Sequence, residues 1–182
     1  MMSANLIPGQ TAEIAGPKKA FLISKPKVVA SMIKRAKRVL LVIGSQSGNI
    51  VTVDGDLIDS VVRFSKAFRM DIAVTGHLIG EFRKRGVENT YSLSIMSVGE
   101  RLRDPEWMGL NGSGPYKLVI FMGHPYYMAW LVLNGLKHFG MHLTTMSLGA
   151  SYQPNASWST GSISEEKWKN EFNTILESLE EA

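Results

Sequence analysis

Residues 39–43 form an uninterrupted apolar run, Val-Leu-Leu-Val-Ile. Arg38 precedes the run and Gly44 follows it. A strand with one face in water alternates apolar and polar residues, whereas a strand buried on both faces reads as a continuous apolar run. The run therefore predicts a central strand of a parallel sheet that helices cover on both faces.

Further strand patterns follow along the chain and extend this sheet. We expect strands at residues 71–75, 117–122 and 142–148, and one more at residues 156–160. Apolar residues at helical spacing separate the strands, which is the alternation of a doubly wound sheet. The sequence therefore predicts an α/β fold, a three-layer, Rossmann-like, open parallel sheet.

The first two helices have recognisable starts. We expect Ser24 to cap a helix that carries Pro26 in its first turn, because serine is a preferred cap and proline is tolerated there. After the first strand, Asp54 or Asp56 is the expected cap of the second helix. Both predictions place a helix directly beside the central strand in sequence.

The later helices are less uniform in their signals. We expect a helix over residues 125–139 that ends at Gly140, and a last helix that Ser162 or Ser164 caps. Residues 77–103 mix both periodicities, and we expect one helix and one short strand there.

Length and local composition predict the domain organisation. A chain of 182 residues favours one domain. Residues 1–21 combine prolines and glycines with little periodicity, so we expect an extended arm there. Residues 22–182 then form a single Rossmann-like α/β domain.

The composition excludes several kinds of chemistry. The chain has no cysteine, which rules out disulfides, thiolate zinc sites, thiolate nucleophiles and cysteine-bound iron–sulfur clusters within it. A formal net charge of +4 is too small to indicate nucleic-acid binding. No secretory signal or bilayer-length apolar stretch is visible, so we expect a cytoplasmic protein that binds no membrane.

The charges are unevenly distributed along the sequence. Basic residues gather early: Lys18, Lys19, Lys25, Lys27, Lys34, Arg35, Lys37 and Arg38. Acidic residues gather at the end: Glu165, Glu166, Glu171, Glu177, Glu180 and Glu181. Two solvated helix faces would explain this pattern, and a docking surface for an acidic partner is the alternative.

Candidate ligand-binding residues follow the expected strands. In an open parallel sheet, ligands bind beyond the carboxyl ends of the strands, where the strand order reverses. The residues at these ends that we assign to cofactor binding are Gly44, Ser45, Thr75, Gly76, His77, Gly123 and His124. The alternative is that each glycine only makes a tight turn. No complete Gly-x-Gly-x-x-Gly fingerprint follows the first strand.

Histidines and aromatic residues leave further alternatives. His77 and His124 could meet at the same edge and do acid–base work, or could be polar loop residues. Gly140 should separate His138 from His142, so we expect no metal site. A cluster of Tyr and Trp at the start of the helix at residues 125–139 suits core packing or an interface.

Several motifs carry a resemblance to a known family. The most specific is residues 104–112, Asp-Pro-Glu-Trp-Met-Gly-Leu-Asn-Gly. Residues 34–44 and 72–76 contribute, as do Tyr116, residues 119–121, Gly123, Tyr126, Tyr127 and residues 136–139 and 153–156. Together they resemble the epsilon subunit of the archaeal acetyl-CoA decarbonylase/synthase complex. The sequence departs from the family's pattern at Val39, where proline is expected, and at Asn111, where aspartate is expected.

The resemblance implies a fold similar to the NAD/FAD-binding domain of deoxyhypusine synthase and sirtuins. It implies no catalytic residues in this chain, because the nickel–iron–sulfur chemistry belongs to the large subunit. It also implies that the small subunit stabilises a carbon monoxide dehydrogenase alpha subunit in an alpha2-epsilon2 assembly, and helps to pass electrons to FAD. In isolation we expect a homo-oligomer.

Two functional hypotheses follow, with a third ranked below them. The first is a non-catalytic subunit of the carbon monoxide dehydrogenase complex. The second is a stand-alone flavin- or nucleotide-binding protein with a Rossmann-like crevice. An independent enzyme of the sirtuin or transferase type ranks last, because no nucleophile, base and orienting group occur together in any motif.

Overall fold

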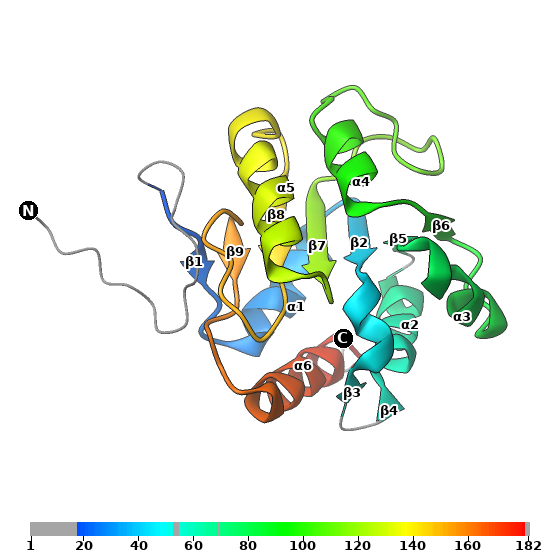
Figure 1. Ribbon diagram of the computed structural model, residues 1–182, viewed down its shortest axis with the longest axis vertical. Coiled ribbons are helices and arrows are strands. Elements are labelled where there is room, and N and C mark those ends of the chain that lie inside the picture. The colour runs from blue at the N-terminus through cyan, green and yellow to red at the C-terminus, as the bar shows by residue number, and fades with distance from the viewer. Residues whose placement is uncertain (1–17, 53–54, 69, 181–182) are drawn as a thin grey trace, which may run out of the picture.

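The computed structural model describes residues 18–52, 55–68 and 70–180. Within these residues, seven parallel strands form one open sheet in the order β1-β9-β8-β7-β2-β5-β6 (Figure 1). The strands are β1 (Phe21–Leu22), β2 (Val39–Ile43), β5 (Asp71–Val74), β6 (Thr90–Ser92), β7 (Leu118–Met122), β8 (Thr144–Ser147) and β9 (Trp158–Ser159). A small antiparallel hairpin joins β3 (Val51–Thr52) to β4 (Gly55–Asp56). The open, Rossmann-like α/β sheet predicted from the sequence is confirmed.

Helices cover both faces of the sheet. One face carries α1 (Pro26–Arg35), α2 (Leu57–Phe68), α3 (Ile79–Lys84) and α6 (Glu165–Glu180). The other face carries α4 (Ile95–Leu102) and α5 (Tyr126–Phe139) (Figure 1). Two short 3₁₀ helices, η1 (Ser45–Asn49) and η2 (Gly76–Leu78), directly follow β2 and β5.

The central strand β2 explains why its sequence is apolar throughout. Leu41 and Ile43 belong to the core beneath α1, α2 and α6. Leu40 and Val42 belong to the core beneath α4 and α5. Because successive side chains of a strand point to opposite faces, a strand between two helical layers needs apolar residues at every position.

Some predicted boundaries are wrong or incomplete. Ser24 does not cap α1, because Pro26 opens the helix and holds Lys25 in the extended conformation of the cap position (φ −139°, ψ 125°). Residues 77–103 contain two helices, α3 and α4, in addition to β6. The predicted strand at 142–148 shortens to β8.

Other boundaries are confirmed by their caps. The carboxylate of Asp56 accepts a hydrogen bond from the amide of Asp59 at the start of α2 (2.7 Å). The hydroxyl of Ser164 accepts one from the amide of Lys167 at the start of α6 (3.3 Å). The predicted arm at residues 1–21 lies outside the described residues up to position 17, and its last residue, Phe21, opens β1.

The charge asymmetry of the sequence becomes a contact between neighbours in the fold. Helix α1, from the basic segment, packs against α6, from the acidic segment. The ammonium group of Lys34 donates a hydrogen bond to the carbonyl oxygen of Ser178 (3.2 Å). The basic side chains of α1 and the acidic side chains of α6 therefore lie on the same face of the sheet, which fits the interpretation as solvated helix faces.

Candidate functional site

The strand order reverses between β2 and β7. From β2 the chain continues outward through β5 and β6, and from β7 it continues outward in the other direction through β8 and β9. The carboxyl ends of β2 and β7 therefore flank the switch point, where ligands bind in open α/β sheets. Gly44 and Gly123, both predicted as site residues, follow these two strands directly.

Close packing fills the gap between β2 and β7. The amide of Gly44 donates to the carbonyl oxygen of Met122 (2.8 Å), and the amide of Gln46 donates to that of Gly123 (2.9 Å). A Cβ atom at Gly44 would overlap the Gly123 carbonyl oxygen and the His124 ring. Gly123 has φ of 65°, which favours glycine, and Ser47 occupies the space of its absent side chain. At these two positions glycine serves close packing between the strand ends.

His124 has a structural hydrogen bond at this edge. Its Nε2 lies 3.1 Å from the carbonyl oxygen of Val42, so Nε2 carries the proton and donates it. Burial lowers the pKa of His124 to about 4, against the smaller opposing effect of the Val42 hydrogen bond. The imidazole is therefore neutral near pH 7.

The other predicted residues lie at the end of β5. The amide and the hydroxyl of Thr75 both donate to the carbonyl oxygen of Ile43 (3.2 Å each). Gly76 and His77 begin η2, and both are exposed. No hydrogen bond between His77 and His124 is found in the described residues, so the proposed acid–base pair has no direct link.

A cavity of about 350 Å³ lies beside the switch point, at the carboxyl ends of β7 and β8. Its volume is at the lower end of the range for small-molecule sites. Of the predicted site residues, Gly123 and His124 line it, and Gly44, Ser45, Thr75, Gly76 and His77 do not. Its other lining residues include Tyr126, Ser147, Gly149, Ser151, Gln153, Glu165 and Trp168.

The lining of this cavity is nearly uncharged. The Glu165 carboxylate is ion-paired with Lys169 (2.8 Å), and no Lys or Arg occurs among the described lining residues. Such a lining suits an uncharged ring better than a phosphate group, which needs cations or several free amides. Sequence reasoning did not identify Ser147, Gln153 and Trp168 as site residues. A signal was available only for Gln153, which begins the motif at residues 153–156.

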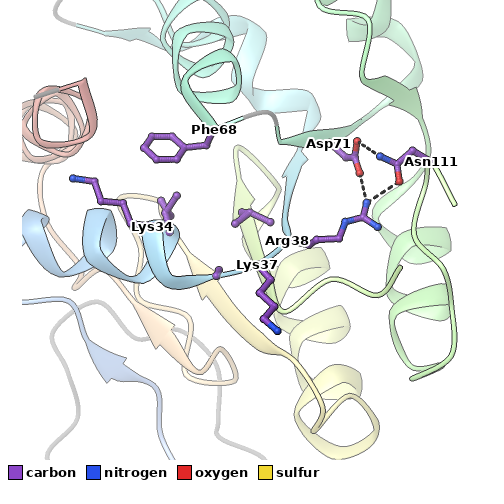
Figure 2. A pocket seen from close by; sticks show the side chains of 9 residues that line it. Lys34, Lys37, Arg38, Phe68, Asp71 and Asn111 are labelled. Atoms are coloured by element: carbon purple, nitrogen blue, oxygen red, sulfur yellow. Dashed lines mark hydrogen bonds and ion pairs between the residues drawn. The ribbon is translucent and has the colours of Figure 1, made fainter. Parts of the chain in front are cut away.

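A second pocket, of about 240 Å³, lies at the amino-terminal ends of β2 and β5, opposite the first cavity (Figure 2). Lys34, Lys37 and Arg38 line it, but Figure 2 shows their cationic groups pointing in different directions. Arg38 is ion-paired with Asp71 and donates a hydrogen bond to Asn111. Because the cations diverge, this pocket does not form an anion-binding site.

In residues 18–52, 55–68 and 70–180, no group of three or more His, Asp or Glu side chains is placed to hold a metal ion. No helix in this part of the chain is long and apolar enough to cross a membrane.

The protein is thus a Rossmann-like α/β domain with a small, nearly uncharged cavity beside the switch point of its sheet. The chain belongs to the family of the CO dehydrogenase beta subunit/acetyl-CoA synthase epsilon subunit, whose model matches residues 2–178.

Individual relatives agree with this family. The chain is similar to the acetyl-CoA decarbonylase/synthase complex subunit epsilon of Methanothermobacter thermautotrophicus, with 30% identity over 92% of this chain and 93% of the relative. The subunit epsilon of Methanothrix soehngenii is 36% identical over 87% of this chain and 82% of its own length. The subunit epsilon 1 of Archaeoglobus fulgidus is 38% identical over 79% and 75%.

Proposed function

We propose that this chain is a non-catalytic small subunit that docks on a carbon monoxide dehydrogenase alpha subunit and stabilises it in an alpha2-epsilon2 assembly. Its relatives are named as subunits of an acetyl-CoA decarbonylase/synthase complex, which supports a role in assembly. The observation that carries the proposal is the group of exposed apolar side chains on α4, on α5 and in the loops that follow these two helices.

Large apolar side chains are exposed on α4 and α5, in the loops that follow these helices, and on the edge strand β1. Among the described residues, they are Phe21, Leu22, Met96, Met108, Tyr127, Leu131, Phe139 and Met141. None of these lies on α1, α2, α3 or α6. Apolar surface gathered on one side marks an interaction site, whereas single scattered residues need no explanation.

Helix α5 is the centre of this surface. Its first eleven residues, 126–136, include no charged side chain, although Tyr127 is 65% exposed and Leu131 is 49% exposed. These two residues are four apart and lie on one stripe of the helix. A helix that is apolar on its outer face as well as its inner face is expected beneath another protein layer.

Co-elution with the purified alpha subunit tests the proposal. The wild-type chain should elute with it in one peak, and Leu131→Glu should elute separately, because a carboxylate would be buried against an apolar partner. Ser31→Glu is the matched control: it places the same charge on the exposed face of α1, and co-elution should persist. Separate peaks for the wild-type chain would refute the docking role.

The state of the isolated chain gives a related test. We expect two copies to cover the same α5 surface when the partner is absent, so light scattering should report a homo-oligomer. Leu131→Glu should then reduce its mass to that of a single chain.

A second proposed role is to help pass electrons to FAD within the complex, or to bind a flavin or nucleotide alone. The supporting observation is the cavity beside the switch point. Calorimetric titration of FAD into the isolated chain and into the complex tests it. Gly149→Leu should weaken binding, since an added side chain there meets no atom within 4 Å and would occupy the cavity. Absence of heat in both titrations would remove this role and leave the docking role intact.

A further inference from the structure

The loop between α4 and β7, residues 103–117, contains the motif that most specifically carried the resemblance in the sequence, and neither proposed role accounts for it. We propose that residues 104–112 form a preformed recognition loop for the alpha subunit, with Met108 as its anchor and Asp71 as the positioning residue that holds its shape. This inference rests on the proposed docking role and adds a second contact to the α5 surface.

Asp71 is the first residue of β5, and its side chain is nearly inaccessible, with the residue 3% exposed. Its carboxylate accepts hydrogen bonds from Arg38 Nη2 (2.7 Å), the Tyr116 hydroxyl (2.6 Å) and Asn111 Nδ2 (3.2 Å). Figure 2 shows Arg38 and Asn111 converging on this carboxylate from two different elements. Asp71 therefore connects the sheet to both the motif and the end of the loop.

Arg38 and Tyr116 complete the network. Arg38 also donates to the Asn111 side-chain oxygen (2.8 Å) and to the carbonyl oxygen of Gly114. Its guanidinium lies 4.7 Å from the centre of the Tyr116 ring, in cation–π geometry. Burial and the hydrogen bond to Asp71 raise the pKa of Tyr116, so its hydroxyl keeps the donated proton. The network therefore pairs the buried Asp71 carboxylate with the Arg38 guanidinium and with the Tyr116 hydroxyl.

The backbone of the loop has a fixed shape. Gly109, Gly112 and Gly114 have φ of 77°, 73° and 119°, a region that other residues rarely adopt. A Cβ atom at Gly109 would lie 2.8 Å from the carbonyl oxygen of Gly114. The amide of Leu110 donates to the Tyr116 hydroxyl (3.0 Å), so the same hydroxyl that binds Asp71 also fixes the middle of the loop.

Two apolar side chains of the loop point inward and one is exposed. Trp107 packs edge-on against Tyr116, with ring centres 5.7 Å apart, and Trp107 and Leu110 pack against the core beneath α4 and α5. Met108, between them, is 54% exposed. A flexible thioether on a rigid loop suits an apolar pocket of a partner.

The acidic side chains near Met108 in the sequence indicate the charge at the rim of the partner's pocket. Asp104 and Glu106 are exposed, and the Asp104 carboxylate accepts a hydrogen bond from the Glu106 amide (2.9 Å). The alpha subunit should therefore present an apolar pocket with Lys or Arg side chains at its rim. Because the loop is already ordered, binding it costs little conformational entropy.

The first experiment measures the affinity of the full chain for the purified alpha subunit. Met108→Ala should weaken binding roughly tenfold, as expected for a buried anchor. Ser113→Ala is the control, since it trims an exposed side chain of the same loop and should bind as the wild type does. If Met108→Ala binds like the wild type while Leu131→Glu does not bind, the loop proposal is wrong and the docking role stands. If the wild-type chain does not bind, both are wrong.

The second experiment tests the positioning role of Asp71. Asp71→Asn keeps the shape of the side chain but removes the charge that Arg38 and Tyr116 bind. Amides of residues 104–114 should exchange hydrogen faster, and association with the alpha subunit should slow by roughly fivefold, because fewer molecules have the binding-competent loop. In a Met108→Ala background the same change should have a smaller effect on affinity. Equal effects in both backgrounds would show that Asp71 acts only on stability.

The third experiment tests the chemistry of the partner. Asp104→Asn combined with Glu106→Gln should slow association at low salt and flatten its dependence on ionic strength. An unchanged salt dependence would contradict the basic rim.

Discussion

Gly44 and Gly123 follow neighbouring strands and are packed so closely that neither can carry a side chain. A Cβ atom at Gly44 would overlap the carbonyl oxygen of Gly123, and one at Gly123 would overlap Ser47. These contacts close the sheet at its switch point and leave the open cavity next to them, at the ends of β7 and β8.

Gly44→Ala should therefore destabilise the protein strongly. The obstacle is a backbone oxygen and the half-buried ring of His124, which is hydrogen-bonded to Val42 and cannot move aside as the end of a flexible side chain can. We expect the free energy of unfolding in urea to fall by roughly 2–4 kcal/mol. Gly80→Ala, in α3, is the control: its added methyl group meets no atom within 4 Å, and stability should rise by about 0.5–1 kcal/mol. Equal effects of the two substitutions would contradict the packing argument.

The half-buried His124 should make stability depend on pH. Burial lowers its pKa to about 4 in the folded protein, whereas the unfolded chain has a histidine pKa of about 6.5. The unfolded state thus binds the proton first as the pH falls. The stabilising contribution is complete above pH about 6.5 and is lost as the pH falls toward about 4, by up to about 3 kcal/mol.

Urea unfolding at a series of pH values measures this effect. His124→Gln should flatten the curve between these two pH values, and His138→Gln, an exposed position on α5, should leave it unchanged. If His124→Gln keeps the slope, another group is responsible for the acid sensitivity.

The sheet could be predicted from the sequence because burial on both faces leaves a direct pattern in the residues. The run Val39–Ile43 is buried at all five positions, and the helix ending at Gly140 is where its apolar spacing places it. Residues 77–103 were only partly predictable: α3 has six residues, too few to show a clear helical period.

The site was harder to predict because strand ends look alike in a sequence. A glycine after a strand can admit a ligand or a packed neighbour, and the sequence does not distinguish the two. In the fold, Gly123 and His124 fill the space of a side chain at Gly44, and Ser47 fills that at Gly123. Which strand end keeps an open cavity depends on side chains from distant segments, such as Gln153 and Trp168. The motif at residues 104–112 was visible, but its connection to Asp71 depends on the fold.

The aromatic stack on α6 allows a test of how strongly the core beneath α1, α2 and α6 stabilises the fold. Phe172 is buried, and its ring stacks on Trp168 with centres 5.6 Å apart and also contacts Phe64 at 6.3 Å. Phe172→Ala should lower the free energy of unfolding by about 3–5 kcal/mol, because the cavity cannot close. Phe139→Ala, which removes an exposed ring on α5, should change it by less than about 0.5 kcal/mol. Urea unfolding of the isolated wild-type chain and of the two variants measures both changes in the free energy of unfolding.

Gly99 sets the distance between α4 and α5, and so the shape of the proposed docking surface. A Cβ atom at Gly99 would lie 2.8 Å from Cγ1 of Val132, which directly follows the exposed Leu131. Gly99→Ala should cost roughly 1–3 kcal/mol by pushing the two helices apart. Val132→Ala removes the opposing methyl groups, so the double variant should be more stable than the sum of the two single effects predicts. Gly99→Ala should also weaken co-elution with the alpha subunit, because it displaces α5, and the double variant should recover it. Strictly additive losses of stability would mean that these two residues do not set the spacing of the helices.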